Sequence, residues 1–476
     1  MGLAYQPVQV VLLYLDANQR IQFSKRCTNL YLTELQIPLK FHSLEFQKTC
    51  TIVNNISYSF GVYREYKHGE SVPEYIKIWN LKGGLPRNSD RFGFETEWHE
   101  AGSYNCYNNK NDKEQGQQFE QSYRIYKEAL KRRMDSNACG NQVSSEVDGI
   151  QIPIKLQNRR FDSYQEQKIK RIAEMPLNQI LEKLTEVEAD YLPHKYWREY
   201  EVNGIEPPFK DFLQLTITDL STTPYCPILI HRFPYTIKLE EATAKLNSII
   251  FAKRAAGLLA KNLRVIDCSA IPKNVRIKIS SLRIHPKLLN SVGRILEASS
   301  FPLKVLTLAE EVKPKQDYFA NEIVRNVQEL NISNRPGNLT SWFPILTKLT
   351  DQKVHLFYGG QAFSTREILK LVKDWRKNGR SLGTELVLGM RSKPECQCVL
   401  RKVGEMKGAR EVNLKMVSLP MANGYYLIVS FRRLPEPLIP KTCDNINFAT
   451  NCHLVMRVCR GGLTWWNWEN IAGDVG

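Results

Sequence analysis

The chain has 476 residues, 42% of them hydrophobic and 10% aromatic, so it has room for about two to four domains and is not disordered as a whole. Lys and Arg outnumber Asp and Glu by 66 to 49, and the resulting charge of +17 would attract phosphate backbones, anionic membranes or acidic protein surfaces alike. The 11 Cys are irregularly spaced and suggest no disulfide framework, residues 1–15 are not expected to form a signal peptide, and no apolar run is long enough to cross a bilayer. We therefore expect a cytoplasmic or nuclear protein.

The first 38 residues predict a small helical unit. Three short helices are expected at about residues 7–15, 19–30 and 31–37, the first opened by Pro7 and the third stopped by Pro38. Apolar residues recur on their faces at helical spacing. They are Val8, Val11, Leu12, Leu15, Ile21 and Phe23.

The region 39–205 predicts a mixture of strands and helices. Expected in chain order are strands at 39–46 and 51–63, a turn at 82–86, an exposed polar insert near 102–118, a charged amphipathic helix at 119–134 and a helix at 165–184 interrupted at Pro176. Two adjacent prolines within 206–209 mark a domain boundary, and the strand-like run 212–218 would begin the second domain.

The C-terminal half repeats a short apolar run. The runs are 282–284, 303–308, 327–332, 353–357 and 384–388. Their starts lie roughly 20 to 30 residues apart, which suits one strand and one return helix per unit. The spacing predicts an irregular array, similar to leucine-rich repeats, over residues 209–437, with a strand-like extension and an uncertain tail at 438–476.

Stacked units of this kind expose a strand-lined face that is typical of proteins that recognise macromolecules. Alternation along the strands predicts which side chains point outward to a protein substrate. They are Lys304, Thr307, Gln328, Asn331, His355 and Glu385. A register error of one residue would exchange this set for the core set.

Motifs that could carry chemistry lack the context that their chemistry needs. Residues 379–383 fit the G-x-S-x-G pattern of a hydrolase, but here a helix precedes the Ser and a strand follows it, the reverse of a nucleophile elbow. Cys396 and Cys398 have no second ligand pair for zinc, and His453 lies near Cys452 and Cys459 by chance. We predict no catalytic, cofactor-binding or metal-binding residues, and therefore no enzymatic activity.

Two parts of the chain carry a family resemblance. Residues 11–20 (VLLYLDANQR), 26–30 (RCTNL), 37–39 (IPL), 54–63 (NNISYSFGVY) and the glycine-rich block at 83–94 resemble, in order, the signature of a nematode-expanded family of uncharacterised proteins, the F-box C type. Residues 299–306 and 372–379 look like the repeats that accompany F-boxes in such proteins. The N-terminus departs from a strong F-box, because Tyr5-Gln6-Pro7 stands where a Leu-Pro start is usual.

The resemblance implies a substrate-recognition subunit of a cullin-RING ubiquitin ligase. An F-box is a three-helix module that docks onto a Skp-type adaptor, so the six apolar residues named for residues 1–38 would face that adaptor or the core of the module. The protein substrate would be a further partner, of unknown identity. The helices could instead be a cap that covers the strands at 39–63. The alternative function is a basic nucleic-acid-binding protein without catalytic activity, in which helix 119–133 could contact RNA.

Overall fold

The computed structural model describes residues 5–96, 113–140, 161–223, 226–254, 256–309, 312, 316–334, 341–349, 352–358, 364–390, 392–413, 415–433 and 452–460. It is an α/β protein, as predicted, and its contacts divide the chain into two compact units. Unit 1 consists of Met1–Ile56 and Ala244–Gly476, and unit 2 consists of Ser57–Thr243. The boundary predicted at 206–209 thus falls inside unit 2, and the N-terminal residues belong with the C-terminal half. Apart from residues 452–460, the predicted tail at 438–476 lies outside the described residues.

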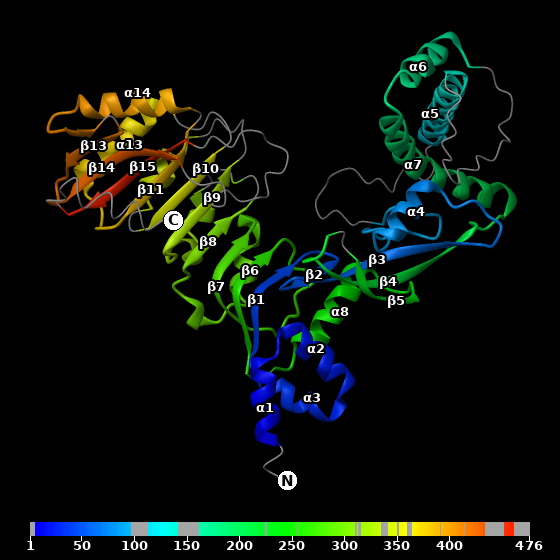
Figure 1. Ribbon diagram of the computed structural model, residues 1–476, viewed down its shortest axis with the longest axis horizontal. Coiled ribbons are helices and arrows are strands. Elements are labelled where there is room, and N and C mark those ends of the chain that lie inside the picture. The colour runs from blue at the N-terminus through cyan, green and yellow to red at the C-terminus, as the bar shows by residue number, and fades with distance from the viewer. Residues whose placement is uncertain are drawn as a thin grey trace. The chain divides into compact units, whose positions relative to one another are not determined.

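Unit 1 begins with three short helices, α1 (Tyr5–Tyr14), α2 (Ala17–Arg26) and α3 (Thr28–Leu35), which Figure 1 shows as a group beyond one end of strand β1. Asp16 caps α2, because its carboxylate accepts a hydrogen bond from the Asn18 backbone N–H, and the Gln19 side chain completes a capping box. The second and third helices therefore begin two to three residues earlier than predicted. The existence of the three helices is confirmed.

The sheet of unit 1 is parallel at its centre. Strand β1 (Leu39–Phe46), found where it was predicted, pairs with β2 (Cys50–Val53) on one side and in parallel with β6 (Leu258–Val265) on the other. The parallel series continues through β7 (Ile277–Ile284), β8 (Val305–Leu308), β9 (Glu329–Asn334), β10 (Lys353–Tyr358) and β11 (Glu385–Gly389). The five repeated runs therefore lie on five neighbouring strands, and the same series also includes β1 and β6.

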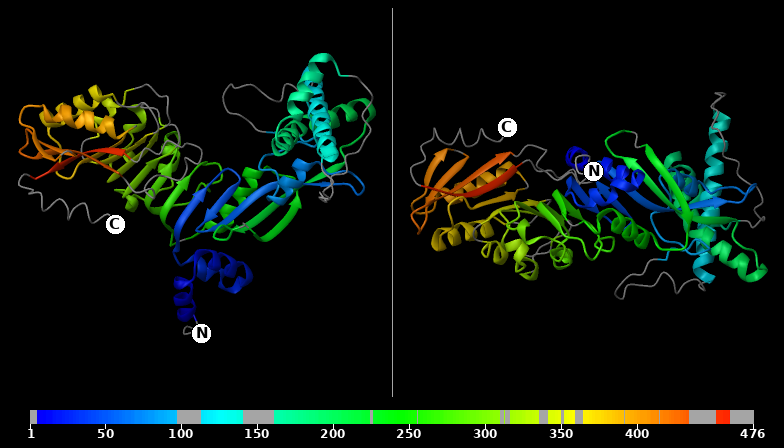
Figure 2. Two further views of the ribbon diagram at one scale, coloured as in Figure 1. Left: turned by 45° about the horizontal axis from the view of Figure 1, so that its top comes forward. Right: turned by 90° about the horizontal axis from the view of Figure 1, so that it is seen from below.

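Beyond β11 the sheet becomes antiparallel. The order continues with β15 (Cys452–Cys459), β14 (Tyr426–Arg433), β13 (Met416–Pro420) and β12 (Arg410–Asn413). The parallel array thus ends at Gly389 and does not extend to residue 437. Helices α13 (Thr365–Asn378) and α14 (Lys393–Gly404) lie on one side of these strands (Figures 1 and 2).

Short helices connect the parallel strands. Between β7 and β10 they are η2 (Pro286–Leu288), α9 (Leu289–Gly293), η3 (Ala298–Ser300), α10 (Gln316–Phe319), α11 (Glu322–Arg325) and α12 (Phe343–Leu346), whereas the longer helices α8 (Leu239–Phe251) and α13 precede β6 and β11. The short helices span three to five residues, too few to form a regular outer layer of helices. The repeat is therefore irregular, as its drifting spacing predicted.

The core of unit 1 follows the register of its parallel strands. Leu282, Leu306 and Leu330 are register partners on β7, β8 and β9, and each is at most 1% exposed. Two residues further along, Ile284, Leu308 and Ile332 form a second fully buried row. The side chains between the two rows point to the opposite side of the sheet, which we call the outer strand face.

Unit 2 combines three strands with four helices among its described residues. The strands are β3 (Ile56–Tyr66), β4 (Phe209–Asp219) and β5 (Pro227–Pro234), in that order, and the helices are α4 (Glu74–Leu81), α5 (Lys113–Gly140), α6 (Ser163–Ala173) and α7 (Leu177–Asn203). The single strand predicted at 51–63 is two strands, β2 and β3, because Asn54 adopts a positive φ of 54° in the turn between them. The glycine turn at 82–86 and the break at Pro176 are confirmed.

The helices of unit 2 pack around a small core of their own. Ile125 and Leu130 of α5 contact Ile169 of α6 and Ile180 of α7, all of them at most 4% exposed. Helix α5 is longer than predicted and already contains residues 113–118 of the expected polar insert, while residues 102–112 lie outside the described residues.

Candidate functional site

The predicted adaptor-facing residues divide between the interior and the surface of the N-terminal helices. Leu12 and Ile21 are 1% and 3% exposed and belong to the core. Val11 and Phe23 are 57% and 37% exposed and point outward. Val8 and Leu15 are half-buried. Only part of the predicted set is therefore available to a partner.

Four further exposed apolar side chains enlarge the surface. With Val11 and Phe23 they make up what we call the N-terminal apolar surface: Val10, Val11, Leu13, Tyr14, Phe23 and Leu32. The sequence did not single out the added residues because α1 is apolar on nearly every side, so helical spacing alone could not separate an inner from an outer face. Several exposed large apolar side chains on one small helical unit are typical of a protein interaction site.

A buried ionic cluster fastens these helices to the rest of unit 1. Arg20 Nη2 lies 2.9 Å and Arg254 Nη1 lies 2.7 Å from Glu34 Oε1, and the three side chains are at most 4% exposed. Arg20 also donates hydrogen bonds to the backbone carbonyls of Pro38 (2.7 Å) and Ile37 (3.0 Å). Burial and the neighbouring charge of Arg254 lower the pKa of Arg20, although the carboxylate of Glu34 raises it. The cluster holds the N-terminal apolar surface in a fixed place on unit 1.

The outer strand face brings three of the predicted substrate-facing residues into one row. Thr307, Asn331 and His355 are direct register partners on β8, β9 and β10. Adjacent strands lie about 4.8 Å apart, so the three side chains form a continuous stripe. Glu385 lies on the same face, one row earlier, where it pairs with Lys353.

The other two predicted residues lie outside that pattern. Lys304 and Gln328 immediately precede β8 and β9, and both are exposed. Lys304 lies three residues before Thr307, and Gln328 lies three residues before Asn331. Because side chains alternate along a strand, each has the parity of the buried core residue of its strand and not that of the outward residue. The alternation argument therefore holds for Thr307, Asn331, His355 and Glu385 and does not extend to the strand entrances.

The stripe continues over strands whose outward residues the sequence did not single out. Glu45 of β1, Arg264 of β6 and Arg283 of β7 continue the row of Thr307. Arg264 Nη1 lies 3.2 Å from Glu45 Oε2. The alternation on β6 and β7 could have identified the two arginines, had the repeat been extended backward to residue 258.

Glu385 is the centre of an ionic cluster on the outer strand face. Its carboxylate lies 3.8 Å from His355 Nε2, 3.4 Å from Arg432 Nη2 and 3.3 Å from Arg457 Nε. Burial raises the pKa of Glu385, but the nearby His355 and the charges of Arg457 and Arg432 outweigh it and hold that pKa below its usual range. Burial and the neighbouring charges of Arg432 and His355 lower the pKa of His453 to about 4. The cluster ties β10, β11, β14 and β15 together.

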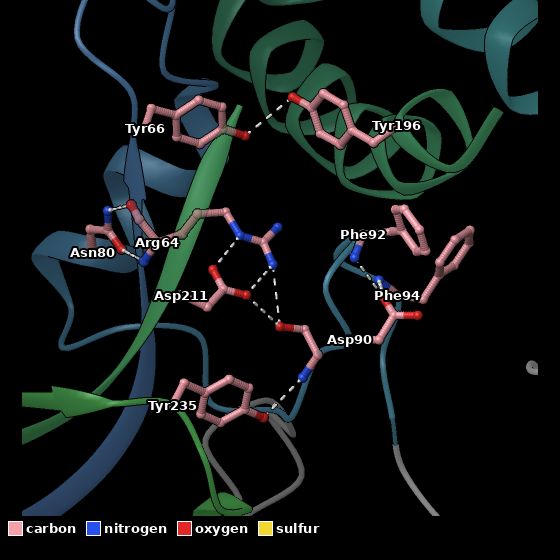
Figure 3. Close-up of polar contacts among 10 residues, drawn as sticks. Arg64, Tyr66, Asn80, Asp90, Phe92, Phe94, Tyr196, Asp211 and Tyr235 are labelled. Carbon is pink, nitrogen blue, oxygen red and sulfur yellow. Dashed lines mark hydrogen bonds and ion pairs between the residues drawn. The ribbon is translucent and has the colours of Figure 1, made fainter. Parts of the chain in front are cut away.

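Unit 2 contains a buried polar network, drawn in Figure 3. Arg64 Nε and Nη2 each lie 2.8 Å from an oxygen of Asp211, and its guanidinium carbon lies 3.8 Å from the centre of the Phe209 ring. Burial lowers the pKa of Arg64, but the hydrogen bonds and charge of Asp211 outweigh it, so the pKa is raised. The Ser89 hydroxyl donates a hydrogen bond to Asp211 Oδ2 (3.1 Å) and accepts one from Arg64 Nη2 (3.2 Å).

The network continues from Ser89 to the start of α8. The Ser89 backbone N–H donates to the Tyr235 hydroxyl (3.3 Å), which in turn donates to Asn88 Oδ1 (3.1 Å). Asn88 also accepts from the Leu239 backbone N–H (2.8 Å) and donates to Glu240 (2.6 Å). Because these groups satisfy one another, the network holds the loop around Ser89 against β4 and does not offer ligand groups.

The candidate chemical motifs have structural roles. Gly379 ends α13 with a φ of 74°, and β11 begins six residues later, so Ser381 follows a helix and precedes a strand as predicted. Cys396 is buried in α14, and burial raises the pKa of its thiol to about 12. Within the described residues, no group of three or more His, Cys, Asp or Glu side chains could hold a metal ion, and no helix is both long and apolar enough to span a membrane.

The fold defines an α/β protein in which a parallel sheet presents a polar face. A family model described as a domain of unknown function, DUF3557, matches residues 238–392, about a third of the chain. This segment begins at α8, contains the parallel strands β6 to β11 and ends just before α14. No curated protein and no solved structure matches the chain.

Proposed function

We propose that this protein is a non-enzymatic adaptor that recruits a protein substrate to a cullin-RING ubiquitin ligase, with α1–α3 as an F-box-like module. The N-terminal apolar surface carries the proposal. A helical unit with its own buried core, and with six large apolar side chains left at the surface, has the form expected of a module that docks onto a second protein. The resemblance of residues 11–39 to the F-box C type supports a Skp-type adaptor as that second protein.

The buried ionic cluster of Arg20, Glu34 and Arg254 supports the same proposal. A docking module can hold a substrate at a defined place on the ligase only if the module is rigidly attached to the substrate-binding part of the chain. Glu34 binds Arg20 within the helical unit and Arg254 beyond α8, so unit 1 contains both the module and the outer strand face in one connected structure. The substrate would bind along the stripe of Thr307, Asn331 and His355.

The test is direct binding between the purified full chain and a purified Skp-type adaptor, measured by isothermal titration calorimetry. Val11→Glu and Leu13→Glu should each weaken binding at least about tenfold, because a charge would enter an apolar interface. Ile249→Glu is the matched control, since Ile249 of α8 is 61% exposed and lies outside the helical unit. No binding of the unmodified chain, or equal loss in the control, would reject the proposal.

The alternative of nucleic-acid binding makes a different prediction. The basic helix α5 uses Arg132 in ion pairs with Glu128 (2.9 Å) and Glu166 (2.8 Å), which reduces the charge that it could offer to RNA. If the chain binds RNA through its excess charge, the affinity must fall steeply as salt is added, whereas apolar docking of the helices is nearly insensitive to salt.

A further inference from the structure

Helix α13 carries a row of positive charge on its solvent side. Its exposed basic residues are Arg366, Lys370, Lys373 and Lys377. Successive residues of a helix are turned by about 100°, so this spacing places the four side chains within an arc of about 60°. At the helical rise the row is about 16 Å long. We call it the α13 basic stripe.

The opposite side of α13 is anchored in the core of unit 1. Its large apolar residues are at most 2% exposed: Ile368, Leu371, Val372 and Trp375. Because these side chains are fully buried, the helix cannot turn about its axis to cover the stripe or to present a different side to solvent. The stripe is therefore a fixed row of charge on unit 1, and no member of it belongs to the outer strand face.

The stripe keeps its charge, because none of its four side chains forms an ion pair with an Asp or Glu among the described residues. The two acidic residues of α13 lie on one flank of the helix and already have partners. Glu367 Oε2 accepts hydrogen bonds from the backbone N–H and the hydroxyl of Ser364, both 3.2 Å long. Asp374 Oδ2 lies 2.8 Å from Arg380 Nη2. Four uncompensated cations in a straight row call for an anionic partner with regularly spaced charges.

We propose that the α13 basic stripe binds the phosphate backbone of a nucleic acid duplex without regard to its sequence. Each strand of a duplex has one phosphate per about 3.4 Å of axis, so the stripe spans about five phosphates of one strand. Three of the four residues are lysines, which bind phosphate as flexible point charges and need no fixed geometry. Each contact also releases condensed counterions, so several weak contacts together give a measurable affinity.

The surroundings of the stripe favour a duplex over other anionic partners. Stable binding to an anionic membrane needs an inserted apolar group or a lipid besides the charge, and α13 exposes no large apolar side chain. Single strands bind by stacking their bases on aromatic rings, but Trp375, the aromatic residue of α13, is 2% exposed. Exposed pairs between lysines and the carboxylates of an acidic protein are individually weak and release no condensed counterions.

The duplex-binding surface goes beyond the proposed adaptor function and does not depend on it. The stripe belongs to α13, whereas the N-terminal apolar surface belongs to α1–α3. Val11→Glu should therefore weaken adaptor binding and leave duplex binding unchanged, and stripe variants should do the reverse. Either proposal can fail while the other holds.

The test is fluorescence anisotropy of labelled duplexes of about 20 base pairs, one of DNA and one of RNA, titrated with the purified full chain. With four phosphate contacts, the logarithm of the association constant for DNA should fall with the logarithm of the salt concentration with a slope of about −3.6. The affinity should thus drop roughly 150-fold between about 50 and 200 mM salt. Lys370→Gln, Lys373→Gln and Lys377→Gln combined should weaken binding at least about tenfold at low salt and flatten the slope to about −0.9.

Two further variants separate the stripe from net charge. Lys131→Gln, Lys170→Gln and Arg171→Gln combined remove three exposed positive charges from α5 and α6, and should leave binding nearly unchanged. Replacement of the three stripe lysines by arginine keeps the charge and should keep the affinity. The proposal would be overturned by no binding of either duplex, by an equal loss in the α5 and α6 variant, or by tighter binding of the stripe to phosphatidylserine vesicles or polyglutamate than to a duplex.

Discussion

Removal of the Asp211 carboxylate should destabilise unit 2 more than any surface ion pair can. Asp211 is the acidic partner of Arg64 among the described residues, with Oδ1 2.8 Å from Arg64 Nε, and the Asp211 and Arg64 side chains are 9% and 1% exposed. Asp211→Ala would leave a buried guanidinium without its counter-charge, a change that costs about 3 to 5 kcal/mol. Such a loss is a large share of the stability of an ordinary domain.

The assay is hydrogen exchange followed by mass spectrometry on peptides from β3 and β4, measured as a function of urea so that the opening free energy of this part of unit 2 is obtained. Glu95→Ala is the matched control, because Glu95 also lies 2.8 Å from an arginine, Arg87, but both are at least 40% exposed. That pair should contribute less than about 1 kcal/mol.

A double variant separates charge from packing. Arg64→Met combined with Asp211→Leu removes both charges and keeps apolar volume, so it should recover most of the stability that Asp211→Ala loses. If Asp211→Ala costs no more than Glu95→Ala, the network is not what holds the loop around Ser89 against β4, and the reasoning fails.

Three further outcomes are expected. Asp16→Ala should cost about 1 kcal/mol and speed hydrogen exchange in α2 and in the turn around Asn54, because the capping box and the 2.8 Å hydrogen bond from Asn54 Nδ2 to Asp16 are both lost. Gly61→Ala should lower the urea midpoint of unit 2, since a Cβ there would lie 2.5 Å from the backbone oxygen of Gly83; an unchanged midpoint would show that the backbone yields. His453 has a folded pKa of about 4 against an ordinary value of 6.5, so the unfolded chain binds more protons between these values, and stability should fall by up to about 3 kcal/mol as pH drops through this window. His453→Gln should remove that dependence, which urea unfolding at several pH values will measure.

Local patterns in the sequence predicted elements well where one physical preference dominated. Strand β1 was placed from Leu39 to Phe46 because apolar and polar residues alternate there, and Pro176 divided two helices because proline cannot continue one. The buried residues of β1 nevertheless do not alternate strictly, since Phe41 and Leu44 are both buried although they are three residues apart. Strict alternation could not show that irregularity.

Features that join distant segments were out of reach. The partner of Glu34 beyond α8, Arg254, is separated from it by 220 residues, and no spacing in one sequence connects them. The outer strand face was predicted in part, because Thr307, Asn331 and His355 follow the repeat. The inward position of Leu12 and the outward position of its neighbours were not predictable, because α1 lacks a polar face that would orient it.

The parallel pairing of β1 with β6 has a consequence for the order in which the chain folds during synthesis. Leu39 pairs with Leu258, so about 220 residues must be made after β1 before its neighbour exists. At about 5 to 20 residues per second this interval lasts roughly 10 to 45 s. Throughout it the α1–α3 helices lack Arg254, the residue that fastens them, and the newly made N-terminus exposes its apolar side chains. The first 56 residues therefore lack their native neighbours in unit 1 until α8, Arg254 and β6 have been made.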